Sequence, residues 1–243
     1  MRRISVIIPA RFGAQRFPGK PLADLAGRPI IAHVVERARR ARGVDVVAVA
    51  TDDERIARAA ERAGAEAILT GDAPTGTDRV AEAARRLRPA PDVVVNLQGD
   101  EPLIESGAIE VLVAAMEPGV VMATFARPLG EGELSRAQVV KVVADLRGDA
   151  LYFSRAAIPH RRAGGASPLA RAHVGIYAFT AAFLQEFAAL PPGQLEAEES
   201  LEQLRALEHG HRIRVADTRY AGFGIDTPED LERARAILAA QRQ

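Results

Sequence analysis

The chain has 243 residues, with 32 basic side chains, 32 acidic side chains and no cysteine. This length suits one large domain, or one domain with a sub-domain, and the absence of cysteine excludes disulfides, thiolate metal sites and a cysteine nucleophile. The balanced charge argues against binding to a nucleic-acid backbone. The N-terminal apolar run is shorter than the core of a signal peptide, and no run approaches the ~20 residues that span a bilayer. We therefore expect a cytoplasmic protein that binds neither nucleic acid nor membranes.

The first half of the chain alternates predicted strands and helices. Apolar runs predict strands over 5–9, 45–51, 65–69 and 92–97, and helical spacing predicts helices over 29–42, 53–63 and 77–87. The strand runs are almost continuous in Val and Ile, which is typical of strands that are buried on both faces. Strands that alternate with helices predict a mostly parallel sheet. The expected fold class is therefore α/β, with a mostly parallel Rossmann-like sheet flanked by helices.

The second half of the chain is less regular. Its patterns predict strands over 120–126, 138–144, 151–155 and 173–179, and an amphipathic helix over 197–208. The last helix is expected to begin with Thr227 as its N-cap and Pro228 as its first residue. We expect 1–243 to form a single domain in which about 125–180 is an inserted sub-domain or dimerisation arm, and hence a homodimer.

A long basic loop, PARFGAQRFPGKPL over 9–22, follows the first predicted strand. Loops of this length in compact domains are usually functional or disordered. Arg11, Arg16 and Lys20 supply positive charge, and Gly13 and Gly19 let backbone N–H groups approach an anion. The loop matches neither the P-loop pattern nor the dinucleotide fingerprint, which argues against a nicotinamide-dependent oxidoreductase. The loop predicts a triphosphate cradle; the alternative, a solvated basic surface, stays open for Arg16 above all.

Lysine is rare in this chain. Of the 32 basic residues only Lys20 and Lys141 are lysines. An arginine is a planar fork, whereas a lysine is a compact point charge on a flexible stem, so a site that needs the latter resists replacement. We predict a functional role for Lys20 and leave both interpretations open for Lys141.

Two aspartates in glycine-rich turns are candidate metal ligands. Asp100 lies in QGDEP, directly after a predicted buried strand, where ligands bind in parallel sheets. Its alternative role is to cap a helix after Pro102. Asp226 lies in GFGIDTP, where Thr227 already serves as the N-cap. Because Mg²⁺ prefers one or two carboxylates together with phosphate oxygens and water, the pair predicts a shared Mg²⁺ site.

Six motifs resemble one family. Nearly the whole chain is spanned by six segments that resemble, in the same order, those of the 3-deoxy-manno-octulosonate cytidylyltransferases, the CMP-Kdo synthetases: PARFGAQRFPGKPL, VNLQGDEP, ALYFSRAAIP, HVGIYAF, LEQLR and GIDTPEDLERAR. That family is similar to the sialic-acid cytidylyltransferases. The resemblance implies a nucleotidyltransferase sheet and a reaction that transfers CMP from CTP to the anomeric hydroxyl of 3-deoxy-D-manno-octulosonate (Kdo), with Mg²⁺, for lipopolysaccharide-type sugar activation. The alternatives are another acidic sugar, either 8-amino-Kdo or a sialic-type acid, and a catalytically silent nucleotide-binding regulator.

The resemblance also implies roles for individual residues. Its catalytic residues are Lys20, Arg11, Asp100 and Asp226, of which the two aspartates hold the metal. Its nucleotide-binding residues are Pro9, Ala10, Arg11, Lys20, Gly76, Thr77, Asp78, Arg79, Gln98 and Asp100. Its sugar-binding residues are Gln98, Arg155, His173, Tyr177, Glu202 and Gln203. Without the resemblance, Glu202 and Gln203 would be read as an exposed helix face with Arg205 as an ion-pair partner. The chain departs from the family pattern at Gln138, His160 and Ala172, all on the sugar side.

Overall fold

The computed structural model describes residues 2–13, 17–163 and 167–240. The chain forms two compact units, one made of residues 1–110 and 222–243 and the other of residues 111–221. The predicted insertion at about 125–180 lies within the sequence of the second unit. None of the helices in these described ranges is long and apolar enough to cross a membrane.

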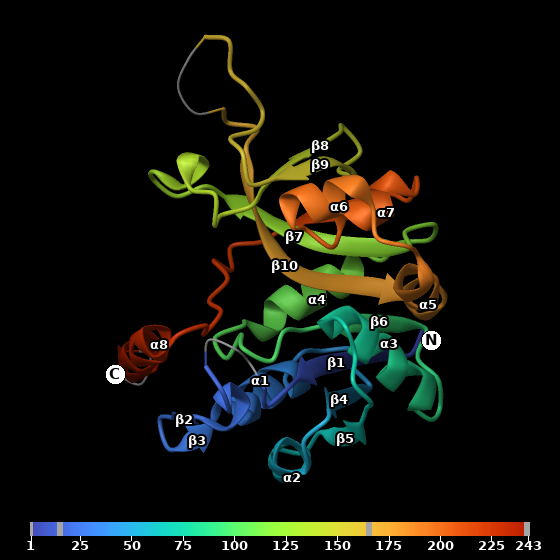
Figure 1. Ribbon diagram of the computed structural model, residues 1–243, viewed down its shortest axis with the longest axis vertical. Coiled ribbons are helices and arrows are strands. Elements are labelled where there is room, and N and C mark those ends of the chain that lie inside the picture. The colour runs from blue at the N-terminus through green and yellow to red at the C-terminus, as the bar shows by residue number, and fades with distance from the viewer. Residues whose placement is uncertain (1, 14–16, 164–166, 241–243) are drawn as a thin grey trace. The chain divides into compact units, whose positions relative to one another are not determined.

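The first unit contains a parallel sheet with the order β6-β1-β4-β5 (Figure 1). Its strands are β1 (Ile4–Ala10), β4 (Val46–Thr51), β5 (Glu66–Leu69) and β6 (Val93–Asn96). In the central strand Ile7 pairs with Ala48 on one side and with Asn96 on the other. Nearly all residues of β1, β4 and β6 are buried, as the continuous apolar runs predicted. The predicted α/β fold class with a mostly parallel sheet is confirmed.

Helices follow the strands of the first unit. They are α1 (Ile30–Arg39), α2 (Glu54–Arg62), α3 (Gly76–Arg86), α4 (Ser106–Ala114, which runs into the second unit) and α8 (Pro228–Ala240), with a short turn η1 (Lys20–Leu22) and a two-stranded ribbon of β2 (Asp24–Leu25) and β3 (Arg28–Pro29). Their ends carry capping signals: Asp53 caps α2, and Gly64 follows it with φ of 88°. Thr75 and Asp78 form a capping box on α3.

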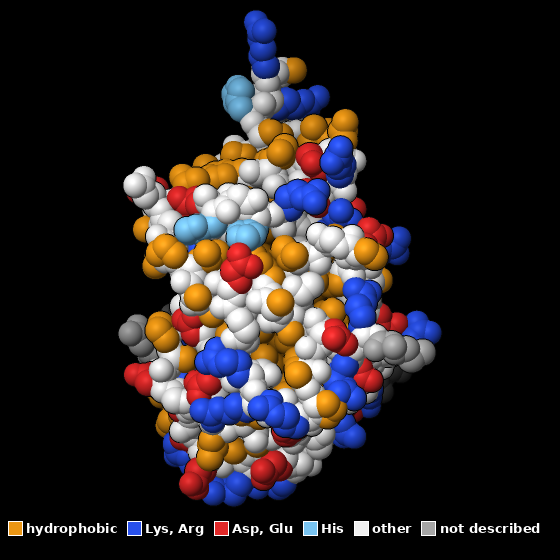
Figure 2. Space-filling view, turned by 90° about the vertical axis from the view of Figure 1, so that its right-hand side faces the viewer, with side chains coloured by type: hydrophobic (Ala, Val, Ile, Leu, Met, Phe, Trp, Pro, Cys, Tyr) orange, Lys and Arg blue, Asp and Glu red, His pale blue; other side chains and the backbone are white. Residues whose placement is uncertain are grey.

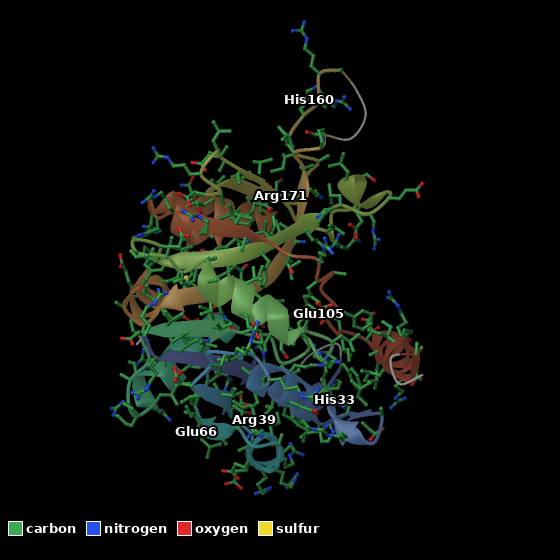
Figure 3. The ribbon with its side chains drawn as sticks, turned by 180° about the vertical axis from the view of Figure 1, so that it is seen from behind. His33, Arg39, Glu66, Glu105, His160 and Arg171 are labelled. Carbon is green, nitrogen blue, oxygen red and sulfur yellow. The ribbon has the colours of Figure 1, made fainter. Side chains whose placement is uncertain are left out.

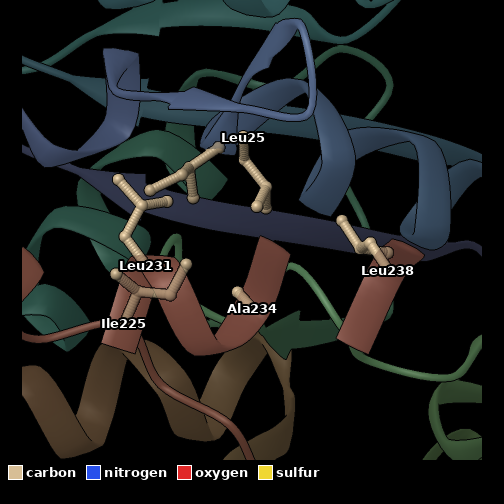
Figure 4. Close-up of a cluster of buried hydrophobic side chains, with 6 residues drawn as sticks. Leu25, Ile225, Leu231, Ala234 and Leu238 are labelled. Atoms are coloured by element: carbon tan, nitrogen blue, oxygen red, sulfur yellow. The ribbon is translucent and has the colours of Figure 1, made fainter. Parts of the chain in front are cut away.

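A buried apolar cluster attaches the C-terminal segment to the N-terminal part of the first unit (Figure 4). Leu231, Ala234 and Leu238 of α8 pack with Leu25 and Ile30. Phe17, Leu103 and Phe223 pack against the edge of this cluster. The cluster therefore brings the segment before α8 close to the basic loop, although more than 200 residues separate them in the chain.

The second unit contains a mixed sheet around β7 (Met122–Pro128). β10 (Arg171–Thr180) runs antiparallel to β7, and β11 (Ile213–Asp217) runs parallel to it. β8 (Lys141–Ala144) pairs with β10 and with β9 (Ala150–Ser154). The remaining elements are η2 (Glu133–Ser135), α5 (Ala181–Ala189), α6 (Gln194–Glu199) and α7 (Leu204–Glu208). Figure 3 shows Arg171 at the start of β10 and His160 on the extended connection that precedes it.

The register of β10 shifts between Val174 and Tyr177. Val174 pairs with Phe125, whereas Tyr177 pairs with Thr124, so Gly175 and Ile176 form a bulge against a continuous β7. A bulge re-aims the side chains beside it and interrupts the ladder of hydrogen bonds. His173 and Tyr177, both predicted to bind the sugar, therefore flank an irregular stretch of strand.

One predicted element is wrong. The helix expected over 197–208 is two helices, because α6 ends at Glu199 and α7 begins at Leu204. Ser200 ends α6 in the left-handed region, with φ of 51°. The leucine spacing suggested one amphipathic helix because Leu201, in the connection after Ser200, and Leu204, the first residue of α7, are both buried. The patterns also did not predict α4, α5 or β11.

Candidate active site

A cavity of about 640 Å³ lies in the first unit, beyond the carboxyl ends of β1 and β6. Because parallel strands end at the same edge of a sheet, the loops that follow them meet there. The cavity is lined by Pro9, Ala10, Arg11, Gly13, Phe17, Lys20, Ala73, Thr75, Gly76, Arg79, Gln98, Gly99, Asp100 and Asp226. Of the predicted nucleotide-binding residues, those on the loop after β1 and the turn after β6 all line the cavity, together with Gly76 and Arg79. Phe17, Ala73 and Thr75 were not predicted.

Lys20 lies between the two predicted metal ligands. Its Nζ is 2.6 Å from Asp100 Oδ2 and 3.3 Å from Asp226 Oδ1. The Lys20 side chain is only 13% exposed, so this contact forms in a partly desolvated site where charges interact more strongly than in water. Gly19, in the left-handed region with φ of 73°, turns the chain into η1 and thereby directs Lys20 into the cavity. The structure therefore brings together the three residues that the sequence placed in separate turns.

Backbone contacts fix the two aspartates. Ile225 N donates to the carbonyl of Asp100 at 2.9 Å, and Phe223 N donates to Glu101 Oε2 at 2.8 Å. Thr227 and Asp230 cap the start of α8, as expected, so capping does not require the carboxylate of Asp226. The alternative role for Asp100 is wrong, because α4 begins only at Ser106 and Asp100 contacts Lys20 instead.

The carboxylates suit a divalent cation. Asp100 and Asp226 both reach one ammonium group, so their oxygens already converge on the position of a single cation. In the part of the chain that the structure describes, no group of three or more His, Cys, Asp or Glu residues could hold a metal. A metal here would complete its coordination with phosphate oxygens and water, which is how Mg²⁺ is usually bound beside nucleotides.

Arg79 is a buried part of the wall of the first cavity. It is 3% exposed, and its guanidinium donates to Thr70 Oγ1 at 2.6 Å and to Asp52 Oδ2 at 2.7 Å. Two fixed partners hold the planar group in one orientation at the cavity. Sequence reasoning missed Asp52 and Thr70, because nothing in their local patterns links them to Arg79.

Other predicted nucleotide residues have different positions. Thr77 is buried behind the cavity, where Asn96 Nδ2 donates to its hydroxyl at 3.3 Å. Asp78 caps α3 through Thr75. Arg11 is exposed and lines the cavity, and Arg16 lies outside the described residues. At Gly99 a Cβ atom would lie 2.8 Å from the carbonyl oxygen of Pro9, so this turn requires glycine.

A second cavity, of about 360 Å³, lies in the second unit. It is lined by Arg127, Gln138, Val139, Val140, His173, Gly175, Tyr177, Leu201 and Gln203. Three of the predicted sugar-binding residues are therefore together, and the Tyr177 hydroxyl donates to Gln203 Oε1 at 3.1 Å. Gln203 is 3% exposed, and Arg205 is buried and paired with Glu196. The reading of 202–205 as an exposed helix face is therefore wrong.

Desolvation controls the ionisation of two residues that line this second cavity, His173 and Tyr177. Each ring is partly exposed at the cavity and is otherwise packed against neighbouring side chains. Burial lowers the pKa of His173 to about 3, so its imidazole is neutral at physiological pH. Burial, together with the charge of Glu202, raises the pKa of Tyr177 well above its ordinary value. Both groups therefore act as neutral hydrogen-bonding partners.

Arg155 does not line this cavity. Its guanidinium donates to the carbonyl oxygens of Glu199, Ala137 and Ser200. Its own carbonyl accepts from Lys141 Nζ, which also donates to the carbonyls of Arg136 and Val139. Lys141 is thus a fully buried ammonium with three carbonyl partners, and this contact explains why the chain keeps a lysine there.

The fold and the cationic cavity are those of a nucleotidyltransferase. The family model for cytidylyltransferases matches residues 5–213. The chain is 84% identical over 240 residues, 99% of its length and 98% of the relative's, to a 3-deoxy-manno-octulosonate cytidylyltransferase of Anaeromyxobacter sp. (strain Fw109-5). It is 48% identical, over 97% of its length and 98% of the relative's, to an 8-amino-3,8-dideoxy-manno-octulosonate cytidylyltransferase of Shewanella halifaxensis.

A solved structure of a CMP:2-keto-3-deoxy-manno-octonic acid synthetase complexed with CTP is also similar. It matches with a TM-score of 0.93 and 42% identity, over 98% of this chain and 99% of that chain. The chain therefore belongs to the cytidylyltransferase family, in its 3-deoxy-manno-octulosonate branch. The resemblance inferred from the six motifs is confirmed.

Proposed function

We propose that this protein transfers CMP from CTP to the anomeric hydroxyl of Kdo, with release of pyrophosphate. The observation that carries the proposal is the convergence of Lys20, Asp100 and Asp226 in one cavity of a chain that is 84% identical to a Kdo cytidylyltransferase. The solved relative that holds CTP supports the choice of nucleotide.

The reaction is an in-line displacement at the α-phosphorus. A bond forms between the sugar oxygen and the α-phosphorus, the bond from that phosphorus to the pyrophosphate oxygen breaks, and the hydroxyl proton leaves to water. Such a transfer needs positioning and electrostatic stabilisation more than covalent help from the protein. Lys20 and Arg11 would neutralise the charge of the triphosphate, and Lys20 would stabilise the charge that develops at the α-phosphate.

Asp100 and Asp226 would hold Mg²⁺. When bound, Mg²⁺ supplies charge neutralisation at the α-phosphate and lowers the pKa of the attacking hydroxyl. In the free protein the Lys20 ammonium contacts both carboxylates and so reduces the repulsion between them before ligands bind. The same two carboxylates would hold the cation beside Lys20, in the cavity that Arg11 also lines.

The nucleotide would occupy the first cavity. Gly76 and the backbone at Pro9 and Ala10 permit close approach, and Arg79 offers a fixed guanidinium beside the base and ribose. Gln98 lies at the cavity, with Nε2 3.4 Å from Asn96 Oδ1, and would contact both nucleotide and sugar. Thr77 would act indirectly, by supporting the first turn of α3.

The sugar would occupy the second cavity. Gln203 Nε2 is buried and has no hydrogen-bond partner among the described residues, so a sugar hydroxyl that reached it would satisfy an unpaired donor. His173, Tyr177 and Glu202 would complete the polar set. Arg155 remains our choice for the sugar carboxylate, because in the described structure its guanidinium contacts only neutral carbonyls and its charge is not matched by an ion pair.

We also propose a cytoplasmic homodimer that assembles through the 125–180 region. CTP is a cytoplasmic metabolite. Leu146, Leu151 and Leu169 are large apolar side chains that are 108%, 63% and 71% exposed, and all three lie in this region. Among the strands of the described residues, β9 pairs only with β8, so it also offers a strand edge.

The test is a pyrophosphate-release assay with CTP and Kdo, run beside UTP, 8-amino-Kdo and a sialic-type acid. We expect turnover with CTP and Kdo, and kcat/KM for Kdo above that for each other sugar. Asp100→Asn should lower kcat at least ~10²-fold at saturating Mg²⁺, by analogy with the loss of one transition-state-stabilising group. Higher kcat/KM for 8-amino-Kdo would reassign the sugar, and CTP binding without turnover would indicate a regulator instead.

A further inference from the structure

Thr124 is a buried threonine of β7 whose hydroxyl lies among three polar groups. Its Oγ1 is 2.9 Å from His173 Nε2, 2.9 Å from the carbonyl of Ile176 and 3.3 Å from the carbonyl of Val174. Both carbonyls belong to the bulge of β10, where the strand ladder is interrupted. Thr124 is fully buried, so water cannot substitute for any of these contacts.

The chemistry of the three partners sets the direction of each hydrogen bond. A hydroxyl has one hydrogen to donate and lone pairs that accept, whereas a carbonyl oxygen can only accept. The single hydrogen of Thr124 therefore points to the carbonyls, with Ile176 O as the nearer. Only a lone pair of Thr124 is left for His173, so His173 Nε2 must carry the hydrogen.

We propose that Thr124 is a positioning residue, which fixes His173 as the Nε2–H tautomer and thereby presents Nδ1 to the second cavity as a hydrogen-bond acceptor for a sugar hydroxyl. The sugar part of this proposal rests on the proposed function, whereas the tautomer does not. His173 Nδ1 has no hydrogen-bond partner within the described ranges, and His173 lines the cavity. Desolvation, which lowers the pKa of His173 to about 3, keeps the second nitrogen unprotonated.

Tyr177, whose ring centroid is 5.6 Å from that of His173, fixes the opposite polarity at Gln203. Its hydroxyl donates to Gln203 Oε1, so the amide keeps Nε2 as a buried donor that has no partner among the described residues. The cavity thus offers one preset acceptor and one preset donor, which matches the two capacities of sugar hydroxyl groups. A site with fixed, buried polar groups rejects ligands that leave those groups unpaired, and this is a source of selectivity for polyhydroxylated substrates.

The tautomer is measured on the whole, ligand-free protein labelled with ¹⁵N-histidine, with the His173 signals assigned by their loss in His173→Gln. We expect one protonated nitrogen, Nε2, and one bare nitrogen, Nδ1, across neutral pH. An Nδ1–H tautomer, or a doubly protonated ring at pH 7, would overturn the proposal without any variant or activity assay.

Variants then test whether Thr124 is responsible. Thr124→Val should release the tautomer preference and raise the KM for Kdo about tenfold, the effect of one lost hydrogen bond in a binding site, with the KM for CTP unchanged. Thr124→Ser keeps the hydroxyl and should restore both readouts. Thr180→Val is the matched control, because it removes a hydroxyl that caps α5 in the same unit but does not contact His173.

The outcomes separate the two claims. If Thr124→Val leaves the tautomer and the KM for Kdo unchanged, Thr124 has no positioning role. If Thr124→Val does not fold, the tautomer of His173 is compared among wild type, Thr124→Ser and Thr180→Val. The proposal expects the same tautomer in all three proteins. A changed tautomer in either variant would contradict a mechanism that depends on the Thr124 hydroxyl. A wild-type protein that shows the expected tautomer but transfers CMP to no sugar would refute the proposed function and leave the tautomer assignment standing.

Discussion

At the scale of single residues, the two lysines of the chain hold different kinds of partners. Lys20 contacts two carboxylates at a cavity, whereas Lys141 is fully buried and donates to three carbonyls. Each position uses a compact ammonium whose donors reach partners in several directions, which a planar guanidinium cannot reproduce. The arrangement explains why both positions remained lysine in an arginine-rich chain.

Replacing each lysine by arginine should separate catalysis from stability. Lys20→Arg should lower kcat/KM by about 10²-fold although the charge is kept, because the fork cannot occupy the same point between the carboxylates. Lys141→Arg should instead lower the free energy of unfolding, because the larger group must be fitted into a buried, carbonyl-lined site. Steady-state kinetics and urea unfolding of both variants measure this, with Arg28→Lys at an exposed ion pair as the control. Equal activity of Lys20→Arg and wild type would reduce Lys20 to a generic cation.

The buried imidazole of His173 should make stability depend on pH. The pKa of His173 is lowered from 6.5 to about 3 in the folded state, so below pH 6.5 the unfolded chain takes up a proton that the folded protein does not. The three groups that contact its ring, Thr124, Phe153 and Tyr177, are uncharged, and the charged residue that lines the same cavity, Arg127, is a cation, which also disfavours a protonated ring. Its contribution to stability is therefore complete above pH 6.5 and declines as the pH falls toward 3.

The size of this effect can be measured against a variant without the titrating ring. Between pH 6.5 and pH 5 the free energy of unfolding should fall by about 1.5 kcal/mol more in wild type than in His173→Gln. Urea unfolding at the two pH values gives the difference. Parallel pH dependences in the two proteins would show that His173 titrates normally.

At the scale of elements, α8 is held by its apolar face and in turn positions Asp226. Leu231, which is 6% exposed, packs against Leu25 and Ile30, and the segment before α8 bonds to the backbone at Asp100. The packing of this helix and the geometry of the two proposed metal ligands, Asp100 and Asp226, are therefore linked. Capping of the same helix does not use the Asp226 carboxylate. Thr227 and Asp230 supply the capping hydrogen bonds at the start of α8, and Asp226 lines the cavity instead.

Truncating Leu231 should therefore damage both stability and the site. Leu231→Ala should lower the free energy of unfolding by about 2–5 kcal/mol, the range for buried leucine, and should raise the Mg²⁺ concentration needed for half-maximal activity. Ile237→Ala is the matched control, because Ile237 lies on the same helix but is 36% exposed. Unfolding curves and Mg²⁺ titrations of the two variants provide the comparison. A stability loss in Leu231→Ala without a change in Mg²⁺ dependence would separate the packing of α8 from the site.

At the scale of the whole molecule, each unit contains its own cavity and its own polar chemistry. The first unit holds the cationic loop and the paired aspartates, and the second holds the neutral cavity with His173 and Gln203. Acidic and basic side chains are mixed on the face shown in Figure 2, in keeping with the zero net charge.

The proposed dimer can be tested at this scale. Sedimentation should give a species of about twice the 26.0 kDa chain mass. Leu151→Glu places a charge on an exposed apolar position of β9 and should shift the protein toward the monomer, whereas Leu69→Glu, at a similarly exposed leucine of the first unit, should not. A 26.0 kDa monomer of the wild-type protein at assay concentrations would contradict the assignment.

The sequence by itself determined the features that depend on near neighbours in the chain. Apolar periodicity predicted the parallel sheet and most of its helices, and Thr227 and Pro228 predicted where α8 begins. The motifs around Lys20, Asp100 and Asp226 predicted the family. Only the tertiary structure decided which distant groups meet: Lys20 with carboxylates 80 and 206 residues away, Arg79 with Asp52, and Thr124 with a bulge in β10. Local patterns arise from backbone geometry and burial within a few residues, whereas these partners are set by how elements pack, which no short stretch of sequence encodes. For the same reason the break at Ser200 and the carbonyl partners of Arg155 were not predicted.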